Sequence, residues 1–414
     1  MQIGVLGGGI IGLSIANWLI QDGHAVTLIE RDPDGRPASF GNAGLVADYA
    51  TIPMANPQLL RSLPGLLLDP RSSVSVRPGY WPAMIRFGRA FRRATRQEAF
   101  DSNHRAMARL IPEACRAFET LVRRCGLEAQ VGDGGCLWVY RGQSAWNDAL
   151  GYQAPTRQGD GVRTEILSPA EVEALEPAIP ADRVTGGVYY PATRHLLSPG
   201  AYCQALMEHF VASGGKLLQA AAERLYEDGD GVGLLANGQR HGFERLVVAL
   251  GPHSAAAMES IGCRIPVVSE RGYHITLEAD ALTLRRPVAW MEHHFFMTPM
   301  QDGVRVAGTT EFAPPEAAAS TARWRRMANW VGELTGRDVR VASRWVGARA
   351  ASPDTLPLIG PTGSSGNVIL ATGHGHLGVT FSAMTGQLVA GLLAPEPDHW
   401  ALGTLSPDRF ARHQ

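Results

Sequence analysis

The sequence contains almost no lysine. Lys and Arg together number 38 among 414 residues, yet Lys216 is the single lysine, so arginine supplies nearly all of the positive charge. An enzyme that forms a Schiff base, including one that uses pyridoxal phosphate, would have to rely on Lys216 alone, which argues against both classes. The 38 basic residues are balanced by 39 acidic ones, so the chain has no overall basic field and we expect no nucleic-acid partner.

Paired cysteines and long apolar runs are also missing. The five cysteines are far apart, with no CxxC pair and no zinc-ligand spacing, so we expect buried thiols, a reducing compartment and no metal site. No apolar run approaches the roughly 18 residues that would indicate a membrane span. The chain opens on a strand-like segment without a charged leader, and we therefore expect a cytoplasmic location.

What the chain has in abundance is apolar and glycine residues. Apolar residues make up 45% of the sequence and charged residues 19%, which is typical of a folded protein rather than a disordered one. At about 150 residues per domain, the length favours two or three domains.

The first thirty residues carry a nucleotide-binding pattern. A short apolar strand at 2–6 leads into a GxGxxG motif, a helical segment follows, and a second strand at 25–29 ends at Glu30. The first glycine permits a tight turn, the second lets the backbone approach a pyrophosphate, and the third lets helix and strand pack closely. Glu30 stands where a carboxylate accepts hydrogen bonds from a ribose, and its charge disfavours a 2′-phosphate. The alternative is a glycine-rich turn in an ordinary α/β unit.

A second glycine-dense junction lies near the C-terminus. The segment 368–378 (VILATGHGHLG) is an apolar strand that runs into Gly373, Gly375 and Gly378, and a helical segment follows at 379–393. A helix N-terminus at this junction could meet a second part of the same ligand, such as a flavin ring that gains negative charge on reduction. An ordinary strand–turn–helix unit remains the alternative on spacing alone.

Five segments together resemble one family. They are GVLGGGIIGLSIANWLIQDGHAVTLIERD (4–32), SFGNAG (39–44), LVVALGPHS (246–254), VGARAASPDTLPLIGP (346–361) and ATGHGHLGVTFSAMTGQLVAGLL (371–393). In these segments the chain resembles the D-amino acid oxidase superfamily of FAD-dependent oxidoreductases, and within it the bacterial D-amino acid dehydrogenases of the small-subunit type. The segments occur in the family's order and span nearly the whole chain.

The resemblance implies one FAD and assigns residues to it. Without a cysteine or histidine motif for covalent attachment, we expect the FAD to be noncovalent. The residues assigned to the ADP half are Gly7, Gly9, Ile10, Ile11, Gly12, Glu30 and Arg31. Those assigned to the pyrophosphate and the approach to the flavin are Ser39, Asn42, Ala43, Gly44 and Gly251. Those assigned to the flavin ring are Gly373, His374, Gly375, His376, Leu377 and Gly378.

The resemblance also implies a fold in which two domains interleave along the chain. We expect a Rossmann-type α/β FAD-binding domain at 1–48, 196–256 and 338–414, with strands at 226–238 and 243–251 returning to its sheet. An α+β substrate domain on a mixed or antiparallel sheet should occupy 49–195 and 257–337. Helical periodicity runs through about 83–125 within it.

An amino acid substrate brings a carboxylate that needs a charged partner, and a bidentate arginine is the usual one. The family's carboxylate-binding arginine precedes the Pro-Asp motif, which here implies Arg349; Arg344 is close by but lacks the motif. The tyrosine that related oxidases supply from the strand 293–299 is replaced here by Phe296. We expect His293, His294 or Tyr273 to line the substrate pocket in its place.

The resemblance implies oxidation of a D-amino acid by hydride transfer from Cα to flavin N5, with no essential acid–base residue. Because the chain offers no lysine to activate dioxygen over a flavin, we expect a dehydrogenase that passes electrons to a quinone or another carrier, rather than an oxidase. Two alternatives are a dehydrogenase of hydroxy-D-proline or another cyclic imino acid, and a flavoprotein subunit with additional partner subunits. The basic amphipathic segment Trp81–Arg96 suggests peripheral contact with the inner face of the cytoplasmic membrane, although a solvated arginine face would have the same pattern.

Overall fold

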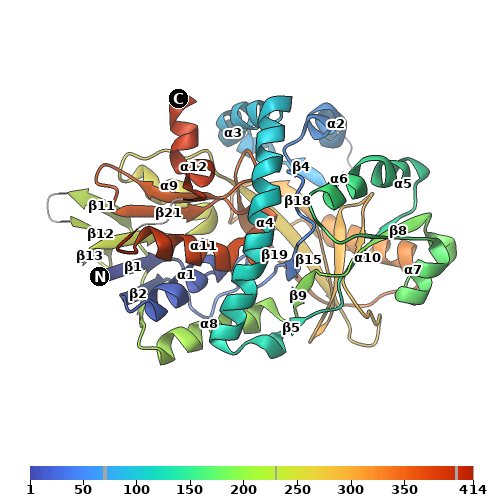
Figure 1. The fold of residues 1–414 in the computed structure, drawn as a ribbon, viewed down its shortest axis with the longest axis horizontal. Helices are drawn as coiled ribbons and strands as arrows, with labels where there is room; N and C mark the ends of the chain where they lie inside the picture. The colour runs from blue at the N-terminus through green and yellow to red at the C-terminus, as the bar shows by residue number, and fades with distance from the viewer. Residues whose placement is uncertain (69–71, 229–230, 397–399, 414) are drawn as a thin grey trace.

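The computed structural model describes residues 1–68, 72–228, 231–396 and 400–413. Within them the strands form a six-stranded sheet, a nine-stranded sheet and two small three-stranded sheets. Figure 1 shows the six-stranded sheet on the left and the nine-stranded sheet on the right, with the long helix α4 (Gln97–Cys125) crossing in front of the region where they meet. This arrangement agrees with the expected Rossmann-type and α+β architecture.

The six-stranded sheet has the order β10-β2-β1-β14-β21-β20. Its first five strands are parallel and come from three distant parts of the chain, and the last strand is antiparallel. Strands buried on both faces are near-continuous apolar runs, as β1 and β21 are. The strands are β1 (Gln2–Leu6), β2 (Ala25–Glu30), β10 (Lys216–Gln219), β14 (Arg245–Val248), β20 (Leu358–Thr362) and β21 (Val368–Thr372).

Two buried helices lie against each other beside this sheet. Helix α1 (Ile10–Gln21) follows β1, and helix α11 (Gly378–Leu392) follows β21. A Cβ at Gly386 would lie 2.8 Å from the backbone oxygen of Ser14, so only glycine allows this close approach. Helix α8 (Pro199–Ala212) packs on α1, and α4 packs on α11. The N-termini of α1 and α11 therefore start from neighbouring parts of the same sheet edge.

The nine-stranded sheet is mixed, with the order β19-β15-β18-β17-β16-β6-β8-β7 and β4 paired with β18. The long strands β15, β18 and β19 are antiparallel neighbours, whereas β16 and β6 are parallel. The strands are β4 (Val74–Val76), β6 (Cys136–Tyr140), β7 (Glu165–Leu167), β8 (Gly186–Tyr190), β15 (Val268–Leu277), β16 (Val288–Trp290), β17 (Phe295–Met300), β18 (Gly303–Phe312) and β19 (Val341–Ala351).

The return of residues 226–238 to the main sheet was a wrong expectation. Strands β11 (Arg224–Asp228), β12 (Gly231–Ala236) and β13 (Gln239–Phe243) form an antiparallel sheet of their own, and only β14 joins the six-stranded sheet. Apolar side chains such as Leu225 and Val232 nevertheless share a core with Leu6 of β1. The third small arrangement joins β3 (Leu45–Val46), β9 (Arg194–Leu196) and β5 (Val131–Gly132).

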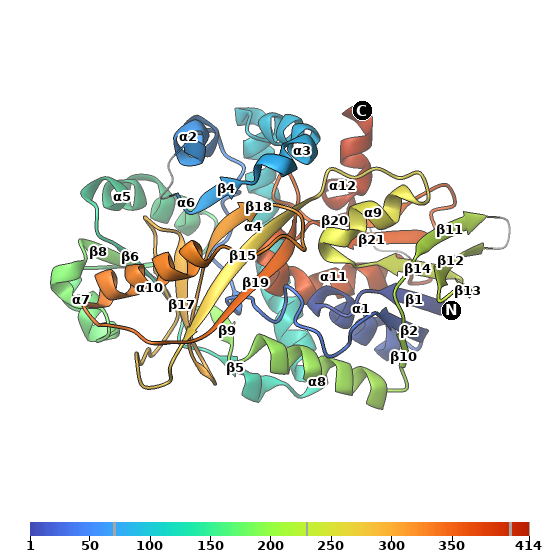
Figure 2. The same ribbon diagram turned by 180° about the vertical axis from the view of Figure 1, so that it is seen from behind.

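The expected single stretch of helix at 83–125 is two helices. Helix α3 (Trp81–Ala94) is capped by Thr95 at its C-terminus, and α4 begins at Gln97. The remaining helices are α2 (Pro57–Leu68), α5 (Gln143–Asp148), α6 (Ala154–Gly159), α7 (Pro169–Leu175), α9 (Ser254–Glu259), α10 (Thr321–Thr335) and α12 (Leu402–Leu405). Figure 2 shows α10 on the outer side of the nine-stranded sheet, beside β15 and β17.

One segment assigned to the FAD domain pairs elsewhere. Residues 341–351 form β19, which is an edge strand of the nine-stranded sheet, and its end reaches His374 through a single β-bridge from Ala351. The expected boundaries of the two domains remain a prediction. The pairing of β19 is what carries Arg349 from the larger sheet toward the glycine-rich junction after β21.

Candidate active site

Four strand ends of the six-stranded sheet meet at one edge. Because β2, β1, β14 and β21 are parallel neighbours, their carboxyl ends bring together Glu30, the Gly7–Gly12 loop, Gly251 and the Gly373–Gly378 loop. The chain leaves β1 toward β2 on one side and reaches β14 on the other, so the edge contains a topological switch point. In open α/β sheets, ligands bind outside the carboxyl ends of the strands at such a point.

The surroundings of the three motif glycines differ in a way that is compatible with their predicted roles. Gly7 has a φ of +111°, and its added Cβ would lie 2.5 Å from the Ala249 oxygen. A Cβ on Gly12 would lie 1.8 Å from the Gly7 oxygen, so helix and loop could not pack together. A Cβ on Gly9 would meet only the Ser39 hydroxyl, at 3.4 Å. Gly7 and Gly12 therefore serve packing, whereas Gly9 leaves its backbone open to a ligand.

Glu30 lies beside the glycine-rich loop Gly7–Gly12. Its carboxylate accepts hydrogen bonds from the backbone N–H of Gly8 at 2.6 Å and of Asp32 at 3.0 Å. Arg31, which follows it, is exposed. The structure thus puts the acidic group at the end of β2, where it faces the start of α1.

The loop 39–44 connects this edge to the nine-stranded sheet. The Ser39 hydroxyl accepts a hydrogen bond from the N–H of Ile10, in the first turn of α1. The Asn42 side chain accepts one from the N–H of Gly44, which has a positive φ. Arg305 of β18 donates to the backbone oxygens of Phe40 and Asn42, and His274 of β15 contacts the oxygen of Gly41 at 3.0 Å. Side chains of the larger sheet therefore hold the loop in place.

The second glycine junction turns directly from β21 into α11. Gly373 and Gly375 both have positive φ, and the Thr372 hydroxyl donates to the Gly251 oxygen, which ties this junction to the one after β14. His374 is buried, with its Nε2 2.9 Å from the Thr385 hydroxyl, and burial lowers the pKa of its imidazole to about 3. A Cβ on Gly251, Gly375 or Gly378 would meet no heavy atom of the described chain within 4 Å.

These features fit FAD. The open side of Gly9 and the first N–H groups of α1 suit a pyrophosphate, and Glu30 suits a ribose. The open space over Gly375 and Gly378, at the start of α11, suits the polar edge of a flavin ring. His376 is exposed beside this space, whereas Leu377 is buried. Ile10 is buried and Ile11 half-buried, so these two contribute their backbone rather than their side chains.

Arg349 lies on β19, which contacts the junction Gly373–Gly378, called here the flavin loop. Its guanidinium is about a quarter exposed, and Nη2 is 3.1 Å from Oε1 of Glu270. The Nε atom is buried without a hydrogen-bond partner among the described residues. A Cβ on Gly272 would lie 2.8 Å from Nη2, so the glycine makes room for the guanidinium. Strand β19, which carries Arg349, contacts the turn Gly375–Leu377 and bridges from Ala351 to His374.

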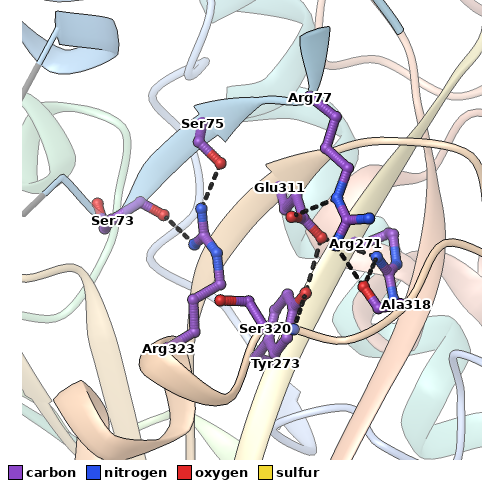
Figure 3. A network of polar contacts seen from close by, with 9 residues as sticks. All are labelled: Ser73, Ser75, Arg77, Arg271, Tyr273, Glu311, Ala318, Ser320 and Arg323. Atoms are coloured by element: carbon purple, nitrogen blue, oxygen red, sulfur yellow. Dashed lines mark hydrogen bonds and ion pairs between the residues drawn. The ribbon is translucent and has the colours of Figure 1, made fainter. Parts of the chain in front are cut away.

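Tyr273 faces the other way. Residues Glu270 and Gly272 lie on the face of β15 that carries Arg349, so Arg271 and Tyr273 lie on the opposite face. The Tyr273 hydroxyl donates to Glu311 at 2.7 Å and accepts from the Ser320 N–H (Figure 3). The expected role of Tyr273 in the substrate pocket does not fit this placement.

The network in Figure 3 is a buried support for the sheet. Arg271 and Arg77 each form an ion pair with Glu311 and donate to the Ala318 oxygen. Arg323 of α10 donates to the Ser73 oxygen and the Ser75 hydroxyl of β4. Burial alone would raise the pKa of Glu311, but its hydrogen bonds and the two ion pairs hold it below the usual value. These contacts join β4, β15, β18 and α10 on the face away from Arg349.

The two histidines and Phe296 are also separated. His293 stacks on Trp330 of α10 with ring centroids 4.5 Å apart, on the outer face with Tyr273. His294 is exposed and has a φ of +51°. Phe296 is paired with Ala307, whose other partner is His274, so it shares the inner face with the residue that holds the loop 39–44. Of these three residues, only Phe296 lies on the face of the sheet that carries Arg349.

Several residues near Arg349 were not singled out from the sequence. Glu270 and Thr310 both contact its guanidinium. Thr309 has a φ of +58° at the point where β18 shifts register, and its hydroxyl is buried without a partner among the described residues. Strained positions of this kind gather at functional sites. The only sequence signal is the even spacing of Glu270 and Gly272 along one strand.

A group of aromatic residues borders the inner face beyond Phe296. The Tyr49 ring packs edge-on against Trp138, with centroids 4.8 Å apart, and in a tilted arrangement against Tyr190, with centroids 4.9 Å apart. The guanidinium of the buried Arg157 lies 4.7 Å from the Trp138 ring and donates to the Tyr49 oxygen. Phe296 packs against the same apolar cluster. Sequence patterns gave no hint that these aromatic side chains meet.

The family profile described as FAD dependent oxidoreductase matches residues 2–392. The chain belongs to this family. Its FAD-binding elements are therefore those of an FAD-dependent oxidoreductase, and FAD is the cofactor. This bears out the family resemblance, the cofactor and the assignment as a redox enzyme.

Relatives of this oxidoreductase extend over almost its entire length. It is 31% identical to a D-amino-acid oxidase of Bradyrhizobium diazoefficiens, over 99% of each chain. It is 30% identical to a D-amino acid dehydrogenase of Methylobacterium radiotolerans, over 99% of this chain and 100% of that one. Among solved structures, the glycine oxidase of Geobacillus kaustophilus has a TM-score of 0.76 at 19% identity, with 98% of each chain covered. The L-proline dehydrogenase of P. horikoshii also has a TM-score of 0.76, at 17% identity, over 100% of this chain and 98% of that one.

The helices of this oxidoreductase give no candidate for a membrane span. None of those in the described ranges is both long and apolar enough to cross a bilayer.

Proposed function

We propose that this oxidoreductase oxidises a D-amino acid at Cα to the imino acid, which water then hydrolyses to a 2-oxo acid and ammonia. The observation that carries the proposal is the half-buried guanidinium of Arg349 beside the flavin loop, with its Nε atom lacking a partner among the described residues. A carboxylate is the natural ligand for such a fork. The names of the two relatives support an amino acid of the D series as the substrate.

Orientation is the work of the protein in this reaction. Bound FAD, which we propose is held noncovalently, supplies the hydride acceptor at its N5 atom. Arg349 fixes the substrate carboxylate, and Phe296 with the neighbouring aromatic residues provides an apolar wall for the substrate side chain. The substrate ammonium loses a proton to solvent water before the Cα hydride leaves. No protein acid or base is required to break the Cα–H bond. The protein therefore accelerates the reaction by holding the substrate in the correct orientation.

For the electron acceptor, we propose a quinone or another carrier rather than dioxygen. Lys216 is exposed at the beginning of β10, at the edge of the six-stranded sheet. Because β10 runs parallel to β2, its first residue lies away from the carboxyl edge that holds the flavin elements. The chain therefore has no lysine to act on dioxygen at the flavin. Oxygen consumption with substrate, compared with reduction of a soluble quinone analogue, distinguishes the two; oxygen uptake as fast as quinone reduction would contradict the proposal.

Helix α3 supports peripheral contact with an anionic membrane. Trp81 is 48% exposed and Ile85 is 59% exposed, although both are large and apolar. Arg86, Arg89 and Arg92 are exposed on the same helix, which carries no acidic residue. Exposed aromatic and aliphatic residues among arginines match the requirements of an interfacial helix. The protein should sediment with phosphatidylglycerol vesicles and not with phosphatidylcholine vesicles, and the double variant Trp81→Ser, Ile85→Ser should bind less; equal binding to both lipids would contradict this part.

Anaerobic bleaching of the flavin tests the proposed reaction. The purified holoprotein is mixed in turn with D-alanine, other linear D-amino acids, cis- and trans-hydroxy-D-proline, their L enantiomers, glycine and sarcosine. Bleaching by several linear D-amino acids, and not by their L forms, is the expected result. Bleaching by cyclic D-imino acids alone would replace the proposal with an imino-acid dehydrogenase. No bleaching by any of them would favour a flavoprotein subunit that needs partner subunits.

A further inference from the structure

A carboxylate directly faces the guanidinium that is proposed to bind the substrate. Glu270 of β15 and Arg349 of β19 are register partners in neighbouring antiparallel strands. Residues opposite one another in a sheet project from the same face with Cβ atoms about 5 Å apart. The pairing is therefore built into the sheet and does not depend on a loop.

The contact between Glu270 and Arg349 leaves part of the carboxylate and part of the guanidinium available to a ligand. Oε1 of Glu270 forms an ion pair with Nη2 of Arg349 and accepts a hydrogen bond from the Thr310 hydroxyl, both at 3.1 Å. Arg349 has five N–H donors in a planar fork, and only those on Nη2 are used here, toward Glu270 and Thr310. The Glu270 side chain is 13% exposed, and its Oε2 forms none of these contacts. One edge of the fork and one carboxylate oxygen can each take a new partner.

We propose that Glu270 binds the ammonium group of the substrate while Arg349 binds its carboxylate. This inference rests on the proposed function, and it identifies a zwitterion as the class of substrate that the site selects. The carboxylate of an amino acid would lie on the open edge of the Arg349 fork. Its ammonium nitrogen, which is two bonds from the carboxyl carbon, would lie toward Oε2 of Glu270. The four charges then alternate in sign, and none is left without a partner.

The same arrangement disfavours simple carboxylates. Glu270 and Arg349 together carry no net charge, so a ligand with only a carboxylate adds one negative charge beside Glu270 in a partly buried site. An uncompensated charge in such surroundings costs free energy. A primary ammonium and the secondary ammonium of a cyclic amino acid both satisfy Glu270, whereas a 2-hydroxy acid does not. Glu270 is thus a specificity residue for the amine.

The test compares two ligands in the variant Glu270→Gln. D-Alanine and propionate differ only in the amino group, and the glutamine keeps the size of the side chain but removes its charge. We expect the dissociation constant of D-alanine, from the rate of anaerobic flavin bleaching, to rise roughly 10- to 100-fold, as for the loss of a charged hydrogen bond. The inhibition constant of propionate in the same assay should fall. Weaker binding of both ligands, or no change in either, would overturn the proposal.

Two matched variants complete the design. Glu278→Gln removes another glutamate that pairs with an arginine, Arg340, just beyond the end of the same strand but exposed to solvent. It should leave both constants at their wild-type values. Glu270→Asp keeps the charge and should restore most of the discrimination against propionate. A general weakening of the fold would not move the two ligands in opposite directions, so the crossed response is specific to the charge of Glu270.

A second pair of ligands separates this inference from the reaction itself. 2-Aminoisobutyrate and 2,2-dimethylpropanoate have no Cα hydrogen and cannot reduce a flavin, so calorimetry measures their binding without turnover. Wild type should bind the amino compound more tightly, and Glu270→Gln should reverse or abolish that order. If D-alanine fails to bleach the flavin but this order holds, the proposed reaction fails and the zwitterion site stands. If bleaching occurs and the order is the same in both proteins, the zwitterion site fails alone.

Discussion

Oε1 of Glu270 lies 3.1 Å from Nη2 of Arg349, and the two residues are register partners on β15 and β19. Gly272, two residues farther along β15, leaves the space that the guanidinium occupies. The end of β19 then bridges to His374 in the flavin loop. The charged pair lies on the nine-stranded sheet, and the bridge to His374 brings the end of β19 to the carboxyl edge of the six-stranded sheet.

The two kinds of glycine at the cofactor edge should respond differently to alanine. Gly12→Ala puts a Cβ 1.8 Å from the Gly7 oxygen, which forces α1 away from the loop. Gly378→Ala meets no described protein atom within 4 Å and intrudes only on the space assigned to the flavin. Urea unfolding of the apoprotein should therefore show a large loss of stability for Gly12→Ala and none for Gly378→Ala. FAD titration should show weaker binding in both variants.

Gly88→Ala serves as the matched control. Gly88 lies on the exposed side of α3, where an added Cβ has no close neighbour in the described chain. Helix propensity predicts a gain of up to about 1 kcal/mol in stability with no change in FAD affinity. If Gly378→Ala bound FAD as tightly as wild type, the assignment of the flavin to this junction would be wrong.

His374 should make the protein less stable in acid. Burial lowers the pKa of its imidazole to about 3, below the usual histidine value of about 6.5. Between these two values the unfolded chain takes up a proton and the folded chain does not, so stability is full above pH 6.5 and falls as the pH decreases toward 3. Linkage gives about 2 kcal/mol for this residue between pH 6.5 and pH 5. In His374→Gln, the difference in free energy of unfolding between pH 7 and pH 5 should be smaller by that amount; parallel pH profiles would contradict it.

The ion pair between Arg409 and Asp354 should stabilise the fold strongly. Arg409, in the C-terminal segment, contacts both carboxylate oxygens and also donates to the Leu356 oxygen, and both side chains are largely buried. Removing one partner of a buried pair leaves the other charge uncompensated, at a cost of about 3 kcal/mol or more. Arg409→Met should lower the free energy of unfolding in urea by about that amount.

The exposed pair of Arg116 and Glu113 on α4 gives the comparison. Arg116→Met should unfold at the wild-type urea concentration, because solvent-exposed ion pairs contribute little. Equal losses in the two variants would mean that the burial of Arg409 has no effect on the strength of its interaction.

Local patterns were enough to predict the dinucleotide-binding unit. The strand, the glycine turn, the helix and the second strand are found at 2–6, 7–12, 10–21 and 25–30, because their periodicity and glycine geometry depend on neighbouring residues alone. The break between α3 and α4 at Thr95 was missed, because neither glycine nor proline marks it. The separate sheet of β11, β12 and β13 was missed as well, because a strand's partners are chosen by long-range packing.

The site was only partly predictable for a similar reason. Arg349 followed from the family motif beside it, but nothing in the local sequence indicates that Glu270 is its partner. That relationship needs the register of β15 against β19. Tyr273 was assigned to the pocket, but it follows Gly272 directly in the strand, so the two residues face opposite sides of the sheet. The Tyr273 hydroxyl instead donates to Glu311. Alternation along a strand would have distinguished the two faces once β15 was recognised as a regular strand.

The comparison of Arg349→Ala with Arg344→Ala tests the central claim most directly. Both arginines lie on β19, but Arg344 is exposed and Arg349 lies near the end of the strand that bridges to the flavin loop. With equal FAD content confirmed by absorbance, anaerobic bleaching by D-alanine should be about 30- to 1,000-fold less efficient in Arg349→Ala, as for a truncated charge pair. Arg344→Ala should match wild type. Equal efficiency in all three proteins would contradict the assignment of Arg349 to the substrate carboxylate.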